Sequence, residues 1–164
     1  MDKIFFETSL TRVHDWVKAA DAKVSIWIAF QGILTAVISP YVSTKIIPII
    51  TKVHWSVSGT FAISLILFCI SFIESISAIT PRLNIAKSAT KSLVYFGHIA
   101  LMGFAEYDQK LSQYDEAKYI LDLKQQIHIS SQIALRKHRE FRFSILFFFI
   151  SILLFIPMFI YSTL

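Results

Sequence analysis

Residues 143–164 read FSILFFFISILLFIPMFIYSTL and contain no charged side chain. A transmembrane helix needs about 20 consecutive, mostly apolar residues, because the hydrocarbon core of a bilayer is about 30 Å thick. This stretch is long enough to cross a membrane. Residues 24–44 also hold no charge, and residues 57–80 hold only Glu74. The sequence therefore predicts an all-α membrane protein with three transmembrane helices, at 24–44, 57–80 and 143–164.

The composition of the whole chain agrees with this class. Hydrophobic residues make up 55% of the sequence and charged residues only 16%, whereas a typical soluble domain is about 25% charged. The net charge of +5 is not arranged as a basic stripe between exposed aromatic residues, so we do not expect a nucleic-acid partner. The single cysteine, Cys69, excludes an internal disulfide and a cysteine-based zinc site.

The Lys and Arg residues are distributed unevenly around the predicted spans. Residues 81–142 carry ten of them and residues 1–23 carry four, whereas residues 45–56 carry two. Short loops rich in Lys and Arg remain in the cytoplasm. We therefore expect the N-terminus and residues 81–142 to be cytoplasmic, and the 45–56 turn and the C-terminus to lie outside.

Residues 1–23 are predicted to form an amphipathic helix that continues into the first span. Neither Pro nor Gly occurs before Gly32, and Pro40 is expected to kink or end the helix. Apolar residues recur at alternating steps of four and three, which is the seam of a packed helix. The seam consists of Phe6, Leu10, Val13, Val17, Ala20 and Val24.

A second long helix is predicted over 106–142 and continues into the third span. The basis is that no Gly or Pro lies between Gly103 and Pro157. Two of the three membrane helices would thus extend into a small cytoplasmic helical module, and residues 1–164 would form a single unit. The apolar face of this helix is marked by Ile120, Leu123, Ile127, Ala134 and Phe141.

Hydroxyl side chains follow one face of the second span. The row consists of Thr60, Ser64, Ser71 and Ser75. Small residues on one face allow membrane helices to approach closely, so the first interpretation is packing within the protein. The second is a polar path across the membrane when several copies assemble, formed by Ser64, Ser71, Glu74 and Ser75. Glu74 itself is either functional, as intramembrane carboxylates often are, or it reaches the interface or pairs with a basic residue such as Arg82.

No catalytic set is recognisable. The five His residues lack the spacing of metal ligands, and neither a Gly-rich phosphate loop nor a Ser/His/Asp or Cys/His arrangement is present. We therefore predict no enzyme activity, no metal and no cofactor. The basic run at 136–142 is either the flank of the third span or a site for a phosphate or an anionic headgroup.

Several short motifs occur together and in a fixed order. They are DAK at 21–23 before Gly32, PRL at 81–83, YFGHIA at 95–100, Glu106-Tyr107 and DLKQQIHISSQIALRKHREF at 122–141. With these motifs the chain resembles, over essentially its whole length, the transmembrane effectors of the bacterial Pycsar (pyrimidine cyclase) antiphage defence systems. YFGHIA is the most specific of the motifs.

The resemblance implies a function. Such effectors are paired with a nucleotide cyclase that makes cyclic CMP or cyclic UMP during phage infection. The cyclic nucleotide is the activating ligand, and the effector then impairs the inner membrane and causes abortive infection. The resemblance thus implies a cyclic pyrimidine nucleotide, the lipid bilayer and further copies of the chain as partners.

The residues themselves offer groups of the kinds that a cyclic nucleotide requires. Cations can contact the phosphate, aromatic rings can stack on the base, and polar groups can bind ribose and base edges. Each is also explicable as a core or helix-surface residue. The candidates are Arg82, Lys91 and Lys137 for the phosphate, Tyr95, Phe96 and Tyr107 for stacking, and His98, Asp21 or Glu106 for polar edges.

Two other functions are compatible with the sequence. The first is a constitutive ion- or proton-conducting protein centred on Glu74 and the serine row, which would conduct without a nucleotide. The second is a non-conducting membrane anchor whose helical seam binds a cytosolic partner.

Overall fold

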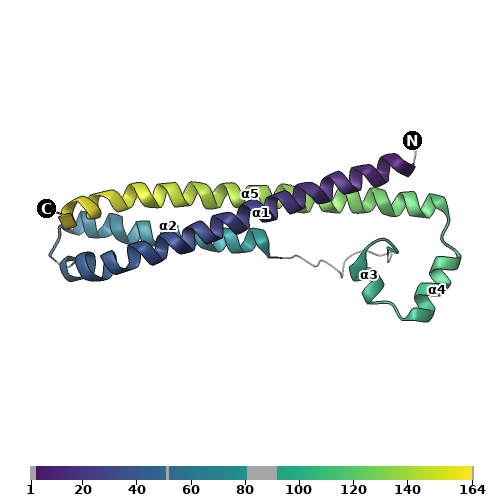
Figure 1. Cartoon of the computed structure of the whole chain (residues 1–164), viewed down its shortest axis with the longest axis horizontal. Coiled ribbons are helices and arrows are strands. Elements are labelled where there is room, and N and C mark those ends of the chain that lie inside the picture. The colour runs from purple at the N-terminus through teal and green to yellow at the C-terminus, as the bar shows by residue number, and fades with distance from the viewer. Residues whose placement is uncertain (1–2, 51, 81–91, 164) are drawn as a thin grey trace. The chain divides into compact units, whose positions relative to one another are not determined.

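The computed structural model describes residues 3–50, 52–80 and 92–163, and all regular elements within these ranges are helical (Figure 1). Three helices are long and apolar enough to cross a membrane. This confirms the predicted fold class. In chain order the elements are α1 (Lys3–Tyr41), a π-helix (Val42–Ile46), a 3-10 helix (Ile47–Ile49), α2 (Trp55–Ile79), α3 (Phe96–Ala100), α4 (Phe104–Ser112) and α5 (Glu116–Thr163).

The chain groups into two compact units, whereas the sequence predicts one. The head unit comprises Met1–Ala20 and Pro81–Leu135, and the membrane unit comprises Asp21–Thr80 and Arg136–Leu164. Helices α1 and α5 each contribute residues to both units. The division follows the charge pattern, because the membrane unit contains all three uncharged or nearly uncharged stretches.

In the head unit, the N-terminal part of α1 packs on α5. Phe6 and Val13 of the predicted seam are buried, as is Leu123 on the predicted face of α5. The ammonium group of Lys124 lies over the ring of Phe6, with 5.1 Å from Nζ to the ring centroid. The Tyr119 hydroxyl donates a hydrogen bond to Glu7 Oε1 (2.9 Å). The two predicted apolar faces therefore meet within this unit.

The predicted helix over 106–142 is divided in the structure. Helix α4 ends at Ser112 and α5 begins at Glu116. The break depends on local hydrogen bonds rather than on Gly or Pro: the Asp115 carboxylate accepts from the backbone N–H of Lys118 (2.8 Å), and Lys118 Nζ donates to the Gln113 carbonyl (2.7 Å). Asp is among the best N-cap residues, because its side chain satisfies an N–H group that has no partner within the helix.

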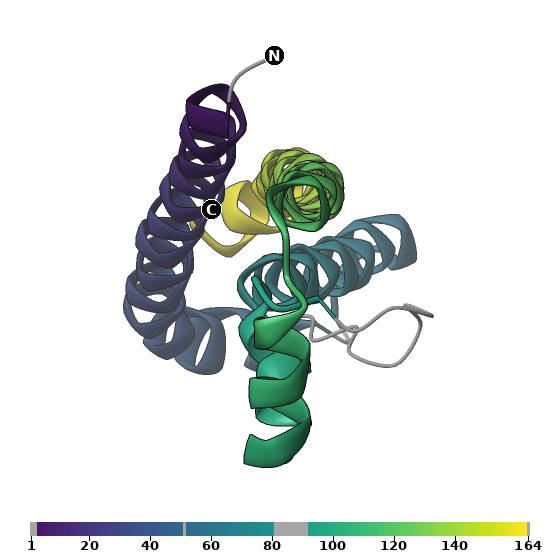
Figure 2. The same cartoon turned by 90° about the vertical axis from the view of Figure 1, so that its right-hand side faces the viewer.

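In the membrane unit, parts of α1 and α5 pack with α2, and the end-on view shows these helices beside one another (Figure 2). Pro40 lies in the last turn of α1, which ends one residue later, as the sequence predicts. A small apolar core lies where the connection between α1 and α2 packs against α2 and α5. The core consists of Ile46, Val53, Phe61 and Met158.

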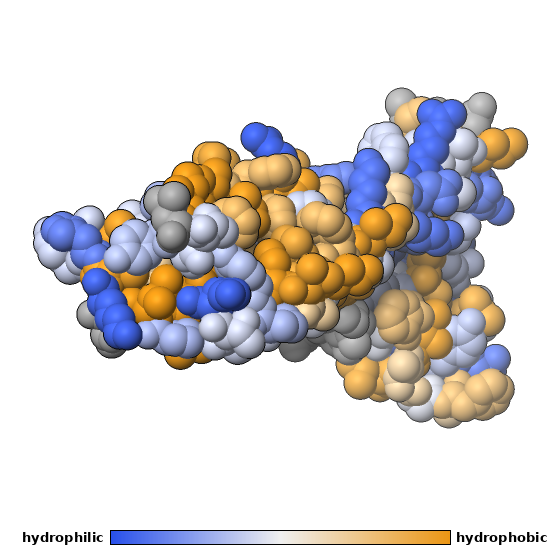
Figure 3. All heavy atoms as spheres, turned by 60° about the vertical axis from the view of Figure 1, so that its left-hand side comes forward, coloured by the Kyte–Doolittle hydropathy of each residue, from blue (hydrophilic) through white to orange (hydrophobic). Residues whose placement is uncertain are grey.

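The outer surface of the membrane unit is apolar. Large hydrophobic side chains are exposed on all three helices, and Figure 3 shows apolar residues over much of the face in view. Examples are Ile26 and Val37 of α1, Ile66 and Ile73 of α2, and Phe149 and Leu153 of α5. Soluble monomers rarely expose contiguous apolar patches of more than a few hundred Å², so this surface is suited to contact with lipid.

Candidate functional site

The interior of the membrane unit contains a buried network of uncharged polar side chains. Gln31 of α1 is fully buried, and its Nε2 donates to Ser71 Oγ of α2 (2.7 Å). Its Oε1 accepts from Ser75 Oγ (3.1 Å). Ser71 and Ser75 are also fully buried. One glutamine therefore binds two successive turns of α2 with both ends of its amide.

Ser144 brings α5 into the same network. Ser71 Oγ donates to the Ser144 carbonyl (2.8 Å), and the hydroxyls of Ser75 and Ser144 are 2.6 Å apart. Trp27 Nε1 donates to Ser144 Oγ (2.9 Å). The protons can be assigned so that these groups form one chain of hydrogen bonds. Trp27 donates to Ser144, Ser144 donates to Ser75, and Ser75 donates to Gln31. All the polar groups are then satisfied, as an apolar environment requires.

The serine row of α2 faces the interior of the membrane unit. Ser64 Oγ donates to the Ser151 carbonyl of α5 (2.7 Å), and Ala78 at the end of the row is fully buried. Thr60 is only partly buried and donates to the Val57 carbonyl in its own helix. Spacing alone thus identified the inner face of α2, but not its partners Gln31 and Ser144.

Glu74 differs from the serines of the predicted polar path. Its side chain is half-buried, and it has no hydrogen-bond or ionic partner among the residues that the structure describes. It therefore lies apart from the network that Ser71 and Ser75 form.

The head unit contains a second, partly buried polar cluster, centred on Asp122 of α5. Oδ2 of Asp122 accepts from Ser92 Oγ (3.1 Å), from the backbone N–H of Leu93 (3.0 Å) and from the Tyr114 hydroxyl. Burial, followed by the hydrogen bond and the charge of Asp122, raises the pKa of Tyr114 above its usual range. Asp122, Ser92 and Tyr114 are not among the site residues predicted from the sequence.

His98 in the YFGHIA motif is part of this cluster. Its Nδ1 accepts from the backbone N–H of Ser92 (3.0 Å), which places the proton of the neutral imidazole on Nε2. Tyr95 packs edge-on against His98, with ring centroids 5.2 Å apart. A Cβ at Gly97 would lie 2.6 Å from Tyr95 Cε1, so only glycine fits without displacing this ring. The YFGHIA motif therefore specifies tight packing of the Tyr95 ring against Gly97 and His98.

The predicted ligand residues are distributed over both units. Tyr95, Phe96, His98 and Tyr107 belong to the head unit. His98 is buried, Tyr95 and Tyr107 are partly buried, and Phe96 is 64% exposed. Glu106, in the first turn of α4, lies within 3.0 Å of Lys110 Nζ. Arg82 and Lys91 lie outside the described residues.

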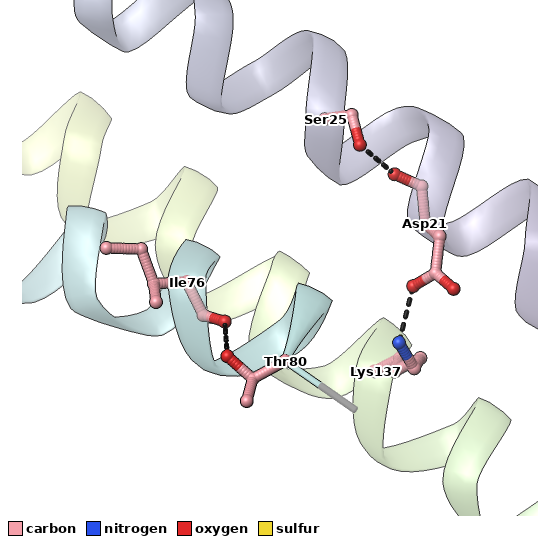
Figure 4. Close-up of polar contacts among 5 residues, drawn as sticks. All are labelled: Asp21, Ser25, Ile76, Thr80 and Lys137. Carbon is pink, nitrogen blue, oxygen red and sulfur yellow. Dashed lines mark hydrogen bonds and ion pairs between the residues drawn. The ribbon is translucent and has the colours of Figure 1, made fainter. Parts of the chain in front are cut away.

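Asp21 and Lys137, predicted as separate ligand contacts, bind each other in the membrane unit (Figure 4). Lys137 is only 9% exposed, so its ammonium group depends on this ion pair. Figure 4 also shows Ser25, whose hydroxyl donates to the Asp21 carbonyl (2.8 Å), and the Thr80 hydroxyl at the end of α2, which donates to the Ile76 carbonyl (2.6 Å). Both charges are thus used within the fold.

Most of the basic run at 136–142 remains accessible. Arg136 Nε lies 2.9 Å from Glu140 Oε1, whereas Arg139 and Arg142 are exposed. Among the described residues, no group of three or more His, Cys, Asp or Glu side chains is arranged to hold a metal ion.

These features define a three-span helical membrane protein with a small polar head unit. The model of the Pycsar effector protein domain (PycTM) matches residues 5–163. The chain therefore belongs to the Pycsar effector family, which confirms the resemblance identified from the motifs. Comparisons with curated proteins and with solved structures gave no match.

Proposed function

We propose that this protein is an inner-membrane effector of antiphage defence that cyclic CMP or cyclic UMP switches from a closed state to one that impairs the membrane. The observation that carries the proposal is the family match over residues 5–163, in a chain with three helices able to span a bilayer. A neighbouring nucleotide cyclase supplies the ligand. The N-terminus and residues 81–142 face the cytoplasm, where the cyclase product is made.

The network around Gln31 suits a closed resting state. Its hydroxyl and amide groups bind one another between α1, α2 and α5. If these helices separate, Ser64, Ser71 and Ser75 lose their partners and need water instead, because an unsatisfied polar group in hydrocarbon costs several kcal/mol. Separation would therefore hydrate the inner face of α2 and create the polar path.

The head unit is the proposed place of ligand binding. Phe96 offers an exposed aromatic face for the base, and His98 Nε2 retains a donor. Arg82 and Lys91 are the proposed phosphate contacts. Because α1 and α5 run from the head unit into the membrane unit, a ligand that favours one packing of their head-unit segments can shift the spans. The shift is limited by the difference in affinity between the two states.

Calorimetry tests ligand binding most simply. Detergent-solubilised protein is titrated with cyclic CMP, cyclic UMP and, for comparison, cyclic AMP. We expect heat from at least one pyrimidine nucleotide and less or none from cyclic AMP. Phe96→Ala should weaken binding, whereas Phe104→Ala, which removes another exposed ring of the head unit, should not. An unchanged affinity in Phe96→Ala would refute the stacking assignment, and no binding by any pyrimidine nucleotide would refute the function.

A further inference from the structure

Glu74 is an ionisable side chain on a membrane-spanning helix, and its carboxylate has no partner among the residues that the structure describes. It is half-buried on α2, and none of the described residues forms a hydrogen bond or an ion pair with it. Carboxylates within membrane spans face the protein interior or pair with a cation, because exposure to hydrocarbon is costly. Glu74 therefore requires a cation from elsewhere.

Arg142 of α5 is the complementary group. It is exposed and directly precedes the uncharged stretch 143–164. Like Glu74, it has no ionic or hydrogen-bond partner among the described residues. A guanidinium group can bind both oxygens of a carboxylate, which makes it well suited to pair with Glu74 at a protein interface.

The hydrogen bonds of the membrane unit show that the two residues lie at the same level. Ser64 of α2 contacts Ser151 of α5, and Ser71 contacts Ser144, so the two helices run antiparallel. Three residues beyond Ser71 on α2 thus correspond to three residues before Ser144 on α5. With about 1.5 Å of rise per residue, Glu74 lies within about one residue of the level of Arg142.

The two side chains belong to different faces of the membrane unit. Ser144 faces α2, and Arg142, two residues earlier, projects about 200° away around α5, since each residue turns a helix by about 100°. This explains why they do not pair within one chain. Copies of one chain insert into a membrane with the same orientation, so residues at the same depth meet when copies associate.

We propose that Glu74 of one copy forms an ion pair with Arg142 of a neighbouring copy in the membrane. The contact joins two different faces, so it is heterologous, and repetition around an axis along the membrane normal closes it into a ring. The partner is a second copy of this chain. The interface is independent of the proposed nucleotide response, and its test uses membranes without any nucleotide.

Site-directed cross-linking tests the contact directly. Two differently tagged copies, both carrying Cys69→Ser, are expressed together, one with Glu74→Cys and the other with Arg142→Cys. Oxidation should give a dimer that carries both tags, because a disulfide forms only where the Cβ atoms approach to about 4 Å. The matched control replaces Glu74→Cys with Leu67→Cys. Leu67 lies on the same face of α2 and is also partly buried, but it is two turns further into the span.

The proposal predicts strong cross-linking for Glu74→Cys with Arg142→Cys and little for Leu67→Cys with Arg142→Cys. No cross-link for the first pair, or equal yields for both pairs, would overturn it. The two tags also show how much of each copy accumulates in the membrane. Only pairs in which both copies accumulate are compared.

Charge reversal distinguishes a second copy of the chain from the other possible partners of Glu74 and Arg142. Glu74→Arg and Arg142→Glu should each lower the oligomer fraction several-fold in native mass measurements, and the double variant should restore it. If Arg82→Glu, and not Arg142→Glu, restores the oligomer fraction of Glu74→Arg, Arg82 is the partner of Glu74 and the proposal fails. If Arg142→Glu changes only binding to vesicles containing anionic lipid, and Glu74→Arg changes nothing, Arg142 serves lipid headgroups and the proposal also fails.

Discussion

The membrane unit and the head unit both bury polar side chains, but they use different chemistry. In the network around Gln31 in the membrane unit the groups are uncharged: an amide, an indole and serine hydroxyls. In the head unit an ionised carboxylate, Asp122, accepts three hydrogen bonds. A charge in hydrocarbon is far more costly than a neutral dipole. The network around Gln31 is thus held by neutral hydrogen bonds, whereas Asp122 gives the head unit charge-assisted ones, which are roughly twice as strong.

Asp122→Ala should have the largest effect on stability. It leaves the hydroxyls of Ser92 and Tyr114 and the N–H of Leu93 without their acceptor. Hydrogen bonds to a charged group contribute about 1.5–3 kcal/mol each, and their effects are not additive, so we expect a loss of roughly 3 kcal/mol in the head unit. Hydrogen exchange of the head-unit amides measures it. Asp108→Ala on exposed α4 is the control, and an equal effect of both variants would contradict the central role of Asp122.

Gln31→Leu should have a smaller effect, about 1–2 kcal/mol, because hydrogen bonds between membrane helices contribute on average only about 0.6 kcal/mol each. The substitution leaves Ser71 and Ser75 without the amide. Unfolding in mixed micelles measures the loss. Gln132→Leu, at an exposed position of α5, should be nearly neutral. A loss at Gln31 larger than at Asp122 would reverse the comparison of the two units.

Gly97→Ala should destabilise the head unit by about 1 kcal/mol, the lower end of the usual cost of overpacking. The new methyl group would collide with the Tyr95 ring, which packs on His98. Gly103→Ala is the control, because a Cβ there meets nothing within 4 Å. Thermal unfolding followed by Tyr fluorescence compares the two variants. Equal melting temperatures would show that the ring moves without cost.

Alkaline pH should weaken the head unit. Burial and Asp122 raise the pKa of Tyr114, so the folded state retains a proton that the unfolded state loses above about pH 10. Stability is therefore complete below that pH and falls as the pH rises further. Tyr119 contributes in the same direction, because its hydrogen bond to Glu7 also raises its pKa.

Tyr114→Phe should reduce this alkaline loss, at a cost of about 1 kcal/mol at neutral pH for one hydrogen bond. Hydrogen exchange is unsuited to high pH, so circular dichroism as a function of pH is the measurement. Tyr107→Phe, also in the head unit and partly buried, is the control. An unchanged alkaline transition in Tyr114→Phe would contradict the assignment.

The sequence predicted those features that depend on local patterns. Long uncharged stretches identified the three spans, and the seam of α1 placed Phe6, Val13 and Val24 on its buried side. The spacing of Ser64, Ser71 and Ser75 identified the inner face of α2. These predictions succeeded because helical periodicity and the length of a span are properties of neighbouring residues.

Features that depend on distant residues were missed. Gln31 and Ser71 are 40 residues apart and Ser71 and Ser144 are 73 apart, so spacing could not pair them. Asp122 is 30 residues from Ser92 and 29 from Leu93, so spacing could not pair these residues either. The break before α5 contains neither Gly nor Pro, although Asp115 followed by Glu116 is a helix-start signal that could have indicated it.

The proposed function requires that a cyclic pyrimidine nucleotide opens a membrane unit that is closed at rest. Dye release from proteoliposomes, with the protein inserted and cyclic CMP or cyclic UMP added to each side in turn, tests it most directly. We predict little release without nucleotide and rapid release when one of the two reaches the head unit, with no response to cyclic AMP. Equal release with and without nucleotide would indicate a constitutive conductor, and no release under any condition would indicate a membrane anchor. Either result would contradict the claim.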